Sequence, residues 1–362
     1  MRILLTGGGT AGHIMPNIAI AAEIKKRKHD AKLLYVGSKS EFERKLISEA
    51  GIDFKSISTG KVRRYFAIQN IIDLFFRVPL GFIQSLRIIE SFKPDVIFSK
   101  GGFVTVPVVL AGALLRKKII IHESDSNLGL ATRVASKFAY KILTSYEDTI
   151  KGFPRRLQKK IIHVGTPIRP EILKGSKHEG YALTGFSHEK PVVLAMGGSL
   201  GAMRINNVLW ASLSKLIPQY QIIHICGHQK SAKSLSNFLI EKLKKNYVEY
   251  EYVGKELKHF YAIADIVISR GGANSLAEIE PFGMPAIIIP LSAKYTRGDQ
   301  IENAKDFKQK DKRRYKIIED EKLNSNTLIE AIKDLSRIGK RATCREAYLR
   351  PVSDIAEILL KN

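Results

Sequence analysis

The sequence predicts an α/β fold built from two doubly wound Rossmann-like domains that face an interdomain cleft. The chain has 362 residues, more than the roughly 250 to 300 at which one hydrophobic core stops growing. Short apolar runs alternate along it with segments of helical periodicity, a pattern typical of parallel sheets joined by crossover helices. Glycine turns follow apolar runs in both halves, as they do where doubly wound folds bind phosphate.

Five short apolar runs in the first half are expected to form strands of a parallel sheet. Each is short enough for a strand and is followed by a polar or helical segment. They are Arg2 to Thr6, Ala31 to Val36, Asp95 to Phe98, Lys118 to Ile121 and Lys141 to Thr144.

The second half repeats this pattern, which predicts a second doubly wound domain. Its expected strands are Val192 to Met196, Gln221 to Cys226, Val248 to Tyr252, Ile266 to Ser269 and Ala286 to Ile289. Helices are expected after Gly201, Ser231, Asn274 and Asp299.

The join between the domains is expected near residues 164–170, where two prolines and a glycine interrupt the pattern. The stretch that follows, residues 174–190, is polar and irregular. We therefore assign residues 1–165 to the first domain and residues 166–345 to the second. The last segment, about 346–362, is amphipathic and could pack back onto the first domain, which the sequence alone does not decide.

Composition excludes several classes of protein. A hydrophobic content of 44% with 26% charged residues is typical of a globular chain. Cys226 and Cys344 are far apart and have no metal-ligand spacing, which fits a reducing cytosol. The N-terminus passes quickly from an apolar strand to a glycine loop, so no signal peptide is expected. No stretch reaches the roughly 18 to 20 apolar residues of a membrane-spanning helix.

The charge is unusual, because 59 Lys and Arg residues against 35 Asp and Glu leave a formal +24. Such a field attracts nucleic acid, anionic lipid or phosphorylated substrates, and composition does not choose among them. Lysine-rich faces exposed to solvent would also produce this net charge. The chain has no RNA-binding aromatic signature, zinc finger or helix-turn-helix, so no nucleic-acid partner is expected.

The first glycine turn, Gly7-Gly8-Gly9-Thr10-Ala11-Gly12-His13, follows a strand and opens a helix. Glycines let the backbone approach a phosphate, and the helix N-terminus offers free N–H groups, so the turn predicts a diphosphate or substrate loop. It contains GxGxxG, but the acidic residue of a dinucleotide site is replaced by Gly37-Ser38-Lys39. A tight turn without a ligand is the alternative.

Two further glycine turns stand in the second half. Met196-Gly197-Gly198-Ser199-Leu200-Gly201-Ala202 occupies the equivalent point of that half, which predicts anion sites on both walls of the cleft. The run from Ser269 to Glu278 contains Gly271-Gly272-Ala273 and is expected to carry Glu278 in the first turn of a helix. A carboxylate there can accept both ribose hydroxyls of a nucleotide, although a surface residue favoured by the helix dipole is the alternative.

A basic cluster followed by bulky apolar residues predicts an interfacial membrane contact that does not span the bilayer. Each Lys or Arg near anionic lipid contributes ~1 kcal/mol. The alternative, that these side chains form the core of a helical hairpin, is expected for about half of them. The residues expected at the membrane are Arg63, Arg64, Phe66, Leu74, Phe75, Phe76 and Phe82.

Several blocks in one order carry a family resemblance. They are Gly8-Gly9-Thr10-Ala11-Gly12-His13 with Pro16, Lys100-Gly101-Gly102-Phe103-Val104 with Pro107, His122-Glu123-Ser124-Asp125 with Gly129-Leu130, Gly165-Thr166-Pro167-Ile168-Arg169, Gly197-Gly198-Ser199-Leu200-Gly201-Ala202 with Asn206, Ala264-Asp265 with Gly271-Gly272-Ala273 and Glu278, and Asp299-Gln300 with Asn303-Ala304. In these blocks the chain resembles the MurG-type UDP-N-acetylglucosamine:undecaprenyl-pyrophosphoryl-muramoyl-pentapeptide N-acetylglucosaminyltransferases.

The resemblance implies a GT-B glycosyltransferase that inverts the anomeric centre. It would transfer N-acetylglucosamine from UDP-N-acetylglucosamine to the 4-hydroxyl of lipid-linked N-acetylmuramoyl-pentapeptide, converting lipid I to lipid II in peptidoglycan synthesis. It further implies a peripheral protein on the cytoplasmic face of the inner membrane, with anionic lipids as partners. A diacylglycerol glycosyltransferase and a sugar-nucleotide epimerase share parts of this architecture and remain alternatives.

The resemblance also implies the site residues. His13 and Asp125 are the candidate catalytic bases. Asp125 stands where some relatives have asparagine, and Ala11 where many have glycine. No DxD-like pair ends a strand, so neither a metal nor another cofactor is expected to be obligatory. The expected substrate-binding residues are Thr10, Ala11, Gly12, Asp125, Arg169, Ser199, Gly271, Gly272, Ala273, Glu278 and Gln300.

Overall fold

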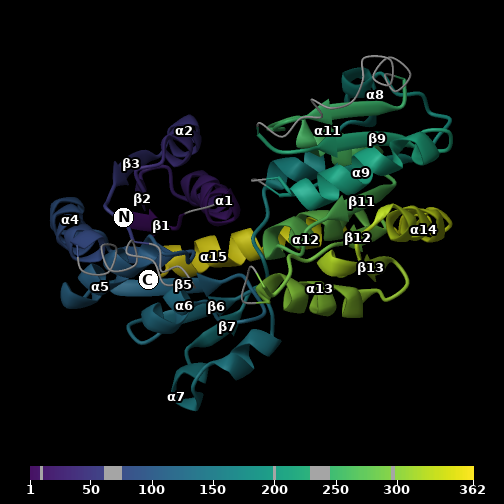
Figure 1. Ribbon diagram of the computed structural model, residues 1–362. Helices are drawn as coiled ribbons and strands as arrows, with labels where there is room; N and C mark the ends of the chain where they lie inside the picture. Colours follow the sequence, from purple (N-terminus) through teal and green to yellow (C-terminus); the bar gives the residue numbers. More distant parts are fainter. Residues whose placement is uncertain (9–10, 61–75, 199–200, 229–244, 295–297) are drawn as a thin grey trace. The chain divides into compact units, whose positions relative to one another are not determined.

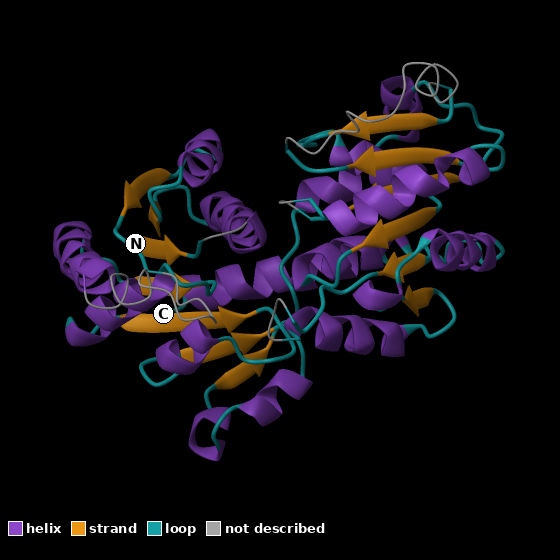
Figure 2. Cartoon of the chain, viewed as in Figure 1, coloured by secondary structure: helices purple, strands orange, loops and turns teal. Residues whose placement is uncertain are grey.

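The structure is a computed structural model that describes residues 1–8, 11–60, 76–198, 201–228, 245–294 and 298–362 (Figure 1). It contains two compact units, one of Met1–Arg169 with Leu349–Asn362 and the other of Pro170–Tyr348. The boundaries expected from the sequence are at residues 165 and 345. Each unit holds one parallel sheet with helices packed around it (Figure 2).

The sheet of the first unit has the order β3-β2-β1-β4-β5-β6-β7, and all its described pairings are parallel. Its inner strands are almost continuously buried, as expected for a sheet covered on both faces. The strands are β1 (Arg2–Thr6), β2 (Lys32–Gly37), β3 (Asp53–Ser56), β4 (Val96–Ser99), β5 (Lys118–Glu123), β6 (Lys141–Thr144) and β7 (Ile161–His163).

Two apolar clusters form the core of this unit, one on each face of the sheet. Helices α1 (Ala11–Arg27), α2 (Glu41–Glu49) and α15 (Arg350–Leu360) contribute to one cluster. Helices α4 (Val78–Phe92), α5 (Thr105–Leu114) and α6 (Leu130–Ala135) contribute to the other, together with residues at α7 (Arg155–Gln158). The C-terminal segment therefore belongs to the first unit, although the whole second unit precedes it in the chain.

The sheet of the second unit has the order β10-β9-β8-β11-β12-β13 and is also parallel. Its strands are β8 (Val192–Met196), β9 (Gln221–Ile225), β10 (Tyr247–Tyr250), β11 (Ile266–Ser269), β12 (Ala286–Ile288) and β13 (Tyr315–Ile317). Its helices include α8 (Lys177–Thr184), α9 (Met203–Leu216), α11 (Leu257–Ile263), α12 (Ala273–Ile279), α13 (Asp299–Lys310) and α14 (Ser325–Ser336).

Local sequence signals explain several helix ends. The side chain of Ser176 accepts the N–H of Glu179 at the start of α8, and Gly185 ends that helix with a φ of 67°. Asn324 and Thr327 form a capping box at the start of α14. The described residues also form short 3₁₀ turns at Asp148–Gly152, Pro170–Lys174, Glu280–Phe282, Asp320–Lys322 and Arg345–Leu349.

The ten expected strands are all present, with ends that differ by at most two residues. The sequence missed three strands, β3, β7 and β13, and each of them lies at an edge of its sheet. Edge strands are short and partly exposed, so they lack the continuous apolar run that identifies an inner strand. The helix expected after Ser231 falls outside the described residues.

Within the described ranges, no helix is both long and apolar enough to cross a bilayer. The same part of the chain has no group of three or more His, Cys, Asp or Glu side chains arranged to hold a metal ion.

Candidate active site at the strand-order reversals

Each sheet has one point at which the strand order reverses, and glycine turns follow the strands at both points. In the first unit β1 and β4 are neighbours, and Thr6 pairs with Ser99 at their carboxyl ends. In the second unit β8 and β11 are neighbours, and Met196 pairs with Ser269. In open α/β sheets, ligands bind beyond the carboxyl ends of such a strand pair.

In the first unit, the turn after β4 packs closely against the glycine loop after β1. Gly101 and Gly102 have left-handed φ angles of 89° and 88°. A Cβ on Gly102 would lie 2.5 Å from the carbonyl oxygen of Gly8 and 3.3 Å from Cδ2 of His13. A side chain does not fit there, so the two glycines allow the turn to enclose the histidine.

His13 lies in the first turn of α1 and is partly buried. Its Nδ1 is 3.2 Å from the carbonyl oxygen of Lys100. Because a carbonyl oxygen only accepts hydrogen bonds, we assign the proton to Nδ1 and the lone pair to Nε2. Burial, followed by the charge of Lys100, lowers the pKa of His13 to about 4. The imidazole is therefore neutral at pH 7 and able to accept a proton.

Lys100 is a buried cation directly after β4. Its Nζ donates a hydrogen bond to Oγ of Ser124. Burial lowers the pKa of Lys100 to about 8, while the neighbouring carboxylates of Glu123 and Asp125 act in the opposite direction. The lysine is thus mostly protonated at neutral pH and places positive charge beneath the turn that holds His13.

Glu123 shapes the loop that carries Asp125. Its buried carboxylate accepts the backbone N–H groups of Asp125 and Gly129, each at 3.1 Å. The carbonyl oxygen of Asp125 also accepts a hydrogen bond from Oγ1 of Thr149 at 3.2 Å. These contacts fix the backbone of Asp125 in the loop that follows β5, the strand beside β4 in the sheet. The side chain of Asp125 remains partly exposed.

In the second unit, the loop after β8 leads into α9. Gly198 and Gly201 have φ angles of 84° and 66°, and the N–H of Gly201 donates to the carbonyl oxygen of Gly198 at 2.9 Å. A Cβ on Gly201 would lie 2.2 Å from the carbonyl oxygen of Cys226. Gly201 therefore rests directly on the segment after β9, where only glycine fits.

The loop after β11 packs against the start of α13. A Cβ on Gly271 would lie 2.3 Å from the carbonyl oxygen of Gln300, and Nδ2 of Asn303 donates to the carbonyl oxygen of Gly271 at 3.2 Å. Oε1 of Gln300 accepts the N–H of Leu291 at 3.0 Å. Two motifs that are separate in the sequence thus lie side by side, Gly271-Gly272-Ala273 and Gln300.

Glu278 is not in the first turn of its helix, which corrects the expectation from the sequence. The helix α12 begins at Ala273, so Glu278 is its sixth residue and lies in the second turn. The helix begins two residues earlier than the start expected after Asn274, and this earlier start moves Glu278 from the first turn into the second. Its side chain is partly buried.

The other expected residues are placed as follows. Gly12 lies in the first turn of α1, and Ala11 is the first residue of that helix. Arg169 ends the main segment of the first unit and is partly buried. Phe76 is exposed, whereas Phe82 is partly buried against the core. The expected residues that fall outside the described ranges are Thr10, Ser199, Arg63, Arg64, Phe66, Leu74 and Phe75.

Sequence reasoning assigned no role to two buried cations, Lys100 and Arg270. Arg270 follows β11 and forms a 2.5 Å ion pair with Asp320, and it also donates to the carbonyl oxygen of Ile289 at 3.1 Å. The available signal was a basic residue placed directly between an apolar strand and a glycine pair. In both cases the cation lies at the end of a strand beside the order reversal and directly before a glycine pair.

Family models match most of the chain. The glycosyltransferase family 28 N-terminal domain matches residues 3–144, and the glycosyltransferase family 28 C-terminal domain matches residues 192–358. A similar curated protein is the UDP-N-acetylglucosamine-N-acetylmuramyl-(pentapeptide) pyrophosphoryl-undecaprenol N-acetylglucosamine transferase of Shouchella clausii. It is 45% identical over 334 residues, which cover 92% of this chain and 90% of the relative.

Solved structures share the fold. The crystal structure of Acinetobacter baumannii MurG has a TM-score of 0.70 at 20% identity and covers 100% of both chains. A UDP-GlcNAc 2-epimerase from Neisseria meningitidis bound to UDP-GlcNAc has a TM-score of 0.66 at 16% identity, also with 100% of both chains covered. These similarities confirm the predicted architecture of two parallel-sheet α/β domains; they do not by themselves distinguish a transferase from an epimerase.

Proposed function

The chain belongs to glycosyltransferase family 28, and from this membership we propose that it catalyses the transfer that completes the lipid-linked cell-wall precursor. It moves N-acetylglucosamine from UDP-N-acetylglucosamine to the 4-hydroxyl of undecaprenyl-pyrophosphoryl-N-acetylmuramoyl-pentapeptide. The observation that carries this function is the 45% identity to a transferase of that name over nearly the whole chain.

The donor binds in the second unit, at the reversal between β8 and β11. Two glycine loops leave the sheet there from neighbouring strands, and each leads into a helix. The N–H groups at the start of α9 suit the diphosphate, as helix N-termini do generally. Glu278 accepts the ribose hydroxyls, and Gln300 contacts the sugar.

His13 is the better candidate for the general base. Its Nδ1 faces the carbonyl oxygen of Lys100 and its pKa is about 4, so Nε2 is available to accept the proton of the acceptor hydroxyl. Asp125 is the second candidate, at the end of the neighbouring strand β5. A low pKa makes His13 a weak base, and alignment of the hydroxyl therefore contributes much of the rate.

The reaction proceeds in one inverting step. The acceptor oxygen forms a bond to the anomeric carbon while the bond to the β-phosphate oxygen of UDP breaks on the opposite side. Negative charge then grows on the diphosphate, and the start of α9 together with Arg169 stabilises it. No metal is required in this scheme, because these groups supply the positive charge.

The lipid acceptor is reached at a membrane surface formed by α4. Leu80 and Ile83 are 48% and 47% exposed and lie on one stripe of the helix, and Phe76, which precedes the helix, is 69% exposed. The opposite stripe of α4 packs into the unit through Gly81, Ser85 and Ile89. With the +24 charge of the chain, this stripe supports peripheral binding to anionic lipid on the cytoplasmic side of the membrane.

Transfer of radiolabelled sugar tests the proposal. The full-length protein is incubated with UDP-N-acetylglucosamine and a short-chain polyprenyl-pyrophosphoryl-muramoyl-pentapeptide, with diacylglycerol and no acceptor as parallel reactions. Labelled product is expected with the muramoyl acceptor alone. Glycosylated diacylglycerol, or epimerised sugar without any acceptor, would retain the fold and overturn the function.

Replacement of Glu278 tests the donor site. Loss of a hydrogen bond to a charged group costs about 1.5 to 3 kcal/mol, so Glu278→Ala is expected to raise the KM for UDP-N-acetylglucosamine at least about tenfold. Glu330→Ala removes an exposed carboxylate of the same unit and should leave that KM unchanged. Equal KM values in both variants would remove Glu278 from the donor site.

A further inference from the structure

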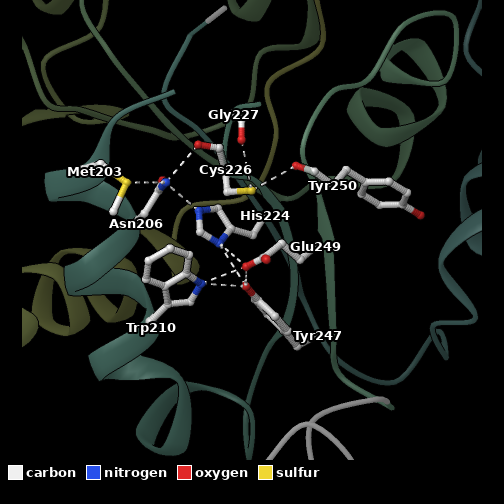
Figure 3. Close-up of polar contacts among 9 residues, drawn as sticks. All are labelled: Met203, Asn206, Trp210, His224, Cys226, Gly227, Tyr247, Glu249 and Tyr250. Carbon is white, nitrogen blue, oxygen red and sulfur yellow. Dashed lines mark hydrogen bonds and ion pairs between the residues drawn. The ribbon is translucent and has the colours of Figure 1, made fainter. Parts of the chain in front are cut away.

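A buried polar network lies beneath the glycine loop of the second unit, and the proposed reaction gives it no role. Its centre is His224 on β9, which is fully buried (Figure 3). On one side His224 faces Asn206 in α9, and on the other side it faces Tyr247 and Glu249 on β10. The network thus connects two strands of the sheet to the first turn of α9.

The hydrogen bonds on the Asn206 side have one consistent direction. Nδ2 of Asn206 donates to the carbonyl oxygen of Cys226 at 2.8 Å. Oδ1 therefore faces Nε2 of His224, at 3.1 Å, and Nε2 must carry a proton. His224 holds the amide of Asn206 in the orientation that engages the Cys226 carbonyl.

The same carbonyl supports the glycine loop. A Cβ on Gly201 would lie 2.2 Å from the Cys226 oxygen and 2.8 Å from Cα of Gly227, so the backbone of Gly201 rests on this peptide. Gly201 in turn precedes the first residues of α9. A contact path therefore runs from His224 through Asn206 and Cys226 to the loop that follows β8.

The Tyr247 side keeps His224 in place. Nδ1 of His224 is 3.0 Å from the hydroxyl of Tyr247 and 3.5 Å from the carboxylate of Glu249. Tyr247 donates to Glu249, and Nε1 of Trp210 donates to the same carboxylate at 2.8 Å. Burial and the nearby carboxylate raise the pKa of Tyr247, so its hydroxyl keeps its proton.

Stability alone does not explain such a network. Buried ionisable groups incur a desolvation cost, and replacing them with well-packed apolar residues is often neutral or stabilising. What an apolar residue would not supply is a fixed orientation of Asn206. We propose that His224 is a positioning residue for donor binding, which holds Asn206 and the Cys226 carbonyl so that Gly201 and the start of α9 keep the geometry that binds the UDP diphosphate. This inference rests on the donor site of the proposed function.

The test compares variants of the full-length protein by UDP binding in calorimetry and by steady-state kinetics. His224→Leu leaves Asn206 without its buried donor and is expected to weaken UDP binding and raise the KM for the UDP-sugar about tenfold. The KM for the lipid acceptor should not change. His224→Gln retains an N–H donor of similar reach and should recover most of the affinity.

The matched control is Ser212→Ala. Ser212 is buried on α9, the helix that carries Asn206, and its hydroxyl donates to the carbonyl oxygen of Val208 at 2.7 Å. Its replacement is expected to change thermal stability but not UDP affinity. If His224→Leu does not fold, the Tyr247→Phe variant tests the proposal instead. It removes one hydrogen-bond partner of His224 and should weaken UDP binding about threefold.

Two results would overturn the inference while the proposed function stands. One is a folded His224→Leu protein, or a Tyr247→Phe protein, that binds UDP as tightly as the wild type. The other is an equal loss of donor and acceptor affinity, which indicates general destabilisation. A wild-type protein that does not bind UDP would overturn both the proposed function and the inference.

Discussion

At His13, the surrounding residues decide a chemical property that the residue type leaves open. An unperturbed histidine is half protonated near pH 6.5, whereas burial and the charge of Lys100 lower the pKa of His13 to about 4. The side chain is thus a neutral base throughout the physiological range. Nδ1 is hydrogen-bonded to the carbonyl oxygen of Lys100, so Nε2 is the nitrogen that can accept the proton of the acceptor hydroxyl.

This environment predicts the pH dependence of catalysis. A base with a lowered pKa stays active until the pH falls toward that value, so kcat/KM for the lipid acceptor should remain level down to roughly pH 5 and decline toward pH 4. His13→Ala should lower kcat/KM by roughly 100-fold and abolish this decline. The measurement is kcat/KM for the acceptor against pH, because this ratio reports the pKa of the free enzyme.

The control for this prediction is His178→Ala, which removes a fully solvent-facing histidine of α8. Lys100→Met should move the decline to higher pH, because it removes a charge that opposes protonation of His13. Lys26→Met, on the exposed side of α1, should not move it. Full activity in His13→Ala would transfer the role of base to another residue, with Asp125 next.

At the scale of the element, the turn after β4 depends on two glycines. Gly102→Ala combines a φ of 88° with a Cβ only 2.5 Å from the Gly8 oxygen. Gly185→Ala has a φ of 67° and nothing within 4 Å, so it isolates the cost of the left-handed conformation, about 1 to 2 kcal/mol. Gly102→Ala should lower the midpoint of thermal unfolding further and also reduce kcat. Equal midpoints would contradict the close packing.

The exposed stripe of α4 predicts membrane binding. Changing Leu80 and Ile83 of this stripe together with Phe76, which precedes the helix, to serine removes exposed apolar area and leaves the buried stripe unchanged. The triple variant should bind anionic vesicles at least about tenfold more weakly. Phe42→Ser, on α2 at the other face of the sheet, provides the control. Sedimentation with vesicles measures the membrane binding of the triple variant and of the control. Unchanged binding of the triple variant would place the membrane contact elsewhere.

At the scale of the whole molecule, the chain returns to its first unit at its end. Helix α15 packs beside α1, and Arg27 donates to Oγ of Ser353 at 2.6 Å. Leu359 is fully buried there, and Leu359→Ala should destabilise the first unit by roughly 2 to 5 kcal/mol. Hydrogen exchange should report faster opening of β1 and α1, while the second unit keeps its protection.

The control for this prediction is Glu357→Ala, on the exposed side of the same helix, which should change stability by less than about 0.5 kcal/mol. UDP affinity should be unchanged in both variants, because the donor loops belong to the second unit. Loss of protection in the second unit alone would contradict the assignment of α15 to the first.

The sequence by itself determined the parallel α/β class, the inner strands and the glycine turns, because these depend on local periodicity and on residues close together in the chain. It also supplied the ordered blocks from Gly8 to Ala304 that carry the family resemblance. Local patterns predict such features because each apolar run, turn or motif is complete within a few residues.

Only the tertiary structure decided the edge strands β3, β7 and β13, the return of α15, the burial of Lys100 and the surroundings of His224. Each of these depends on residues distant in sequence. Asn206 meets His224 from another element, and Lys100 reaches Ser124 on the loop after the next strand. Contacts between residues distant in sequence determine the burial, tautomer and pKa of a side chain, and local sequence patterns do not predict which partners it will contact.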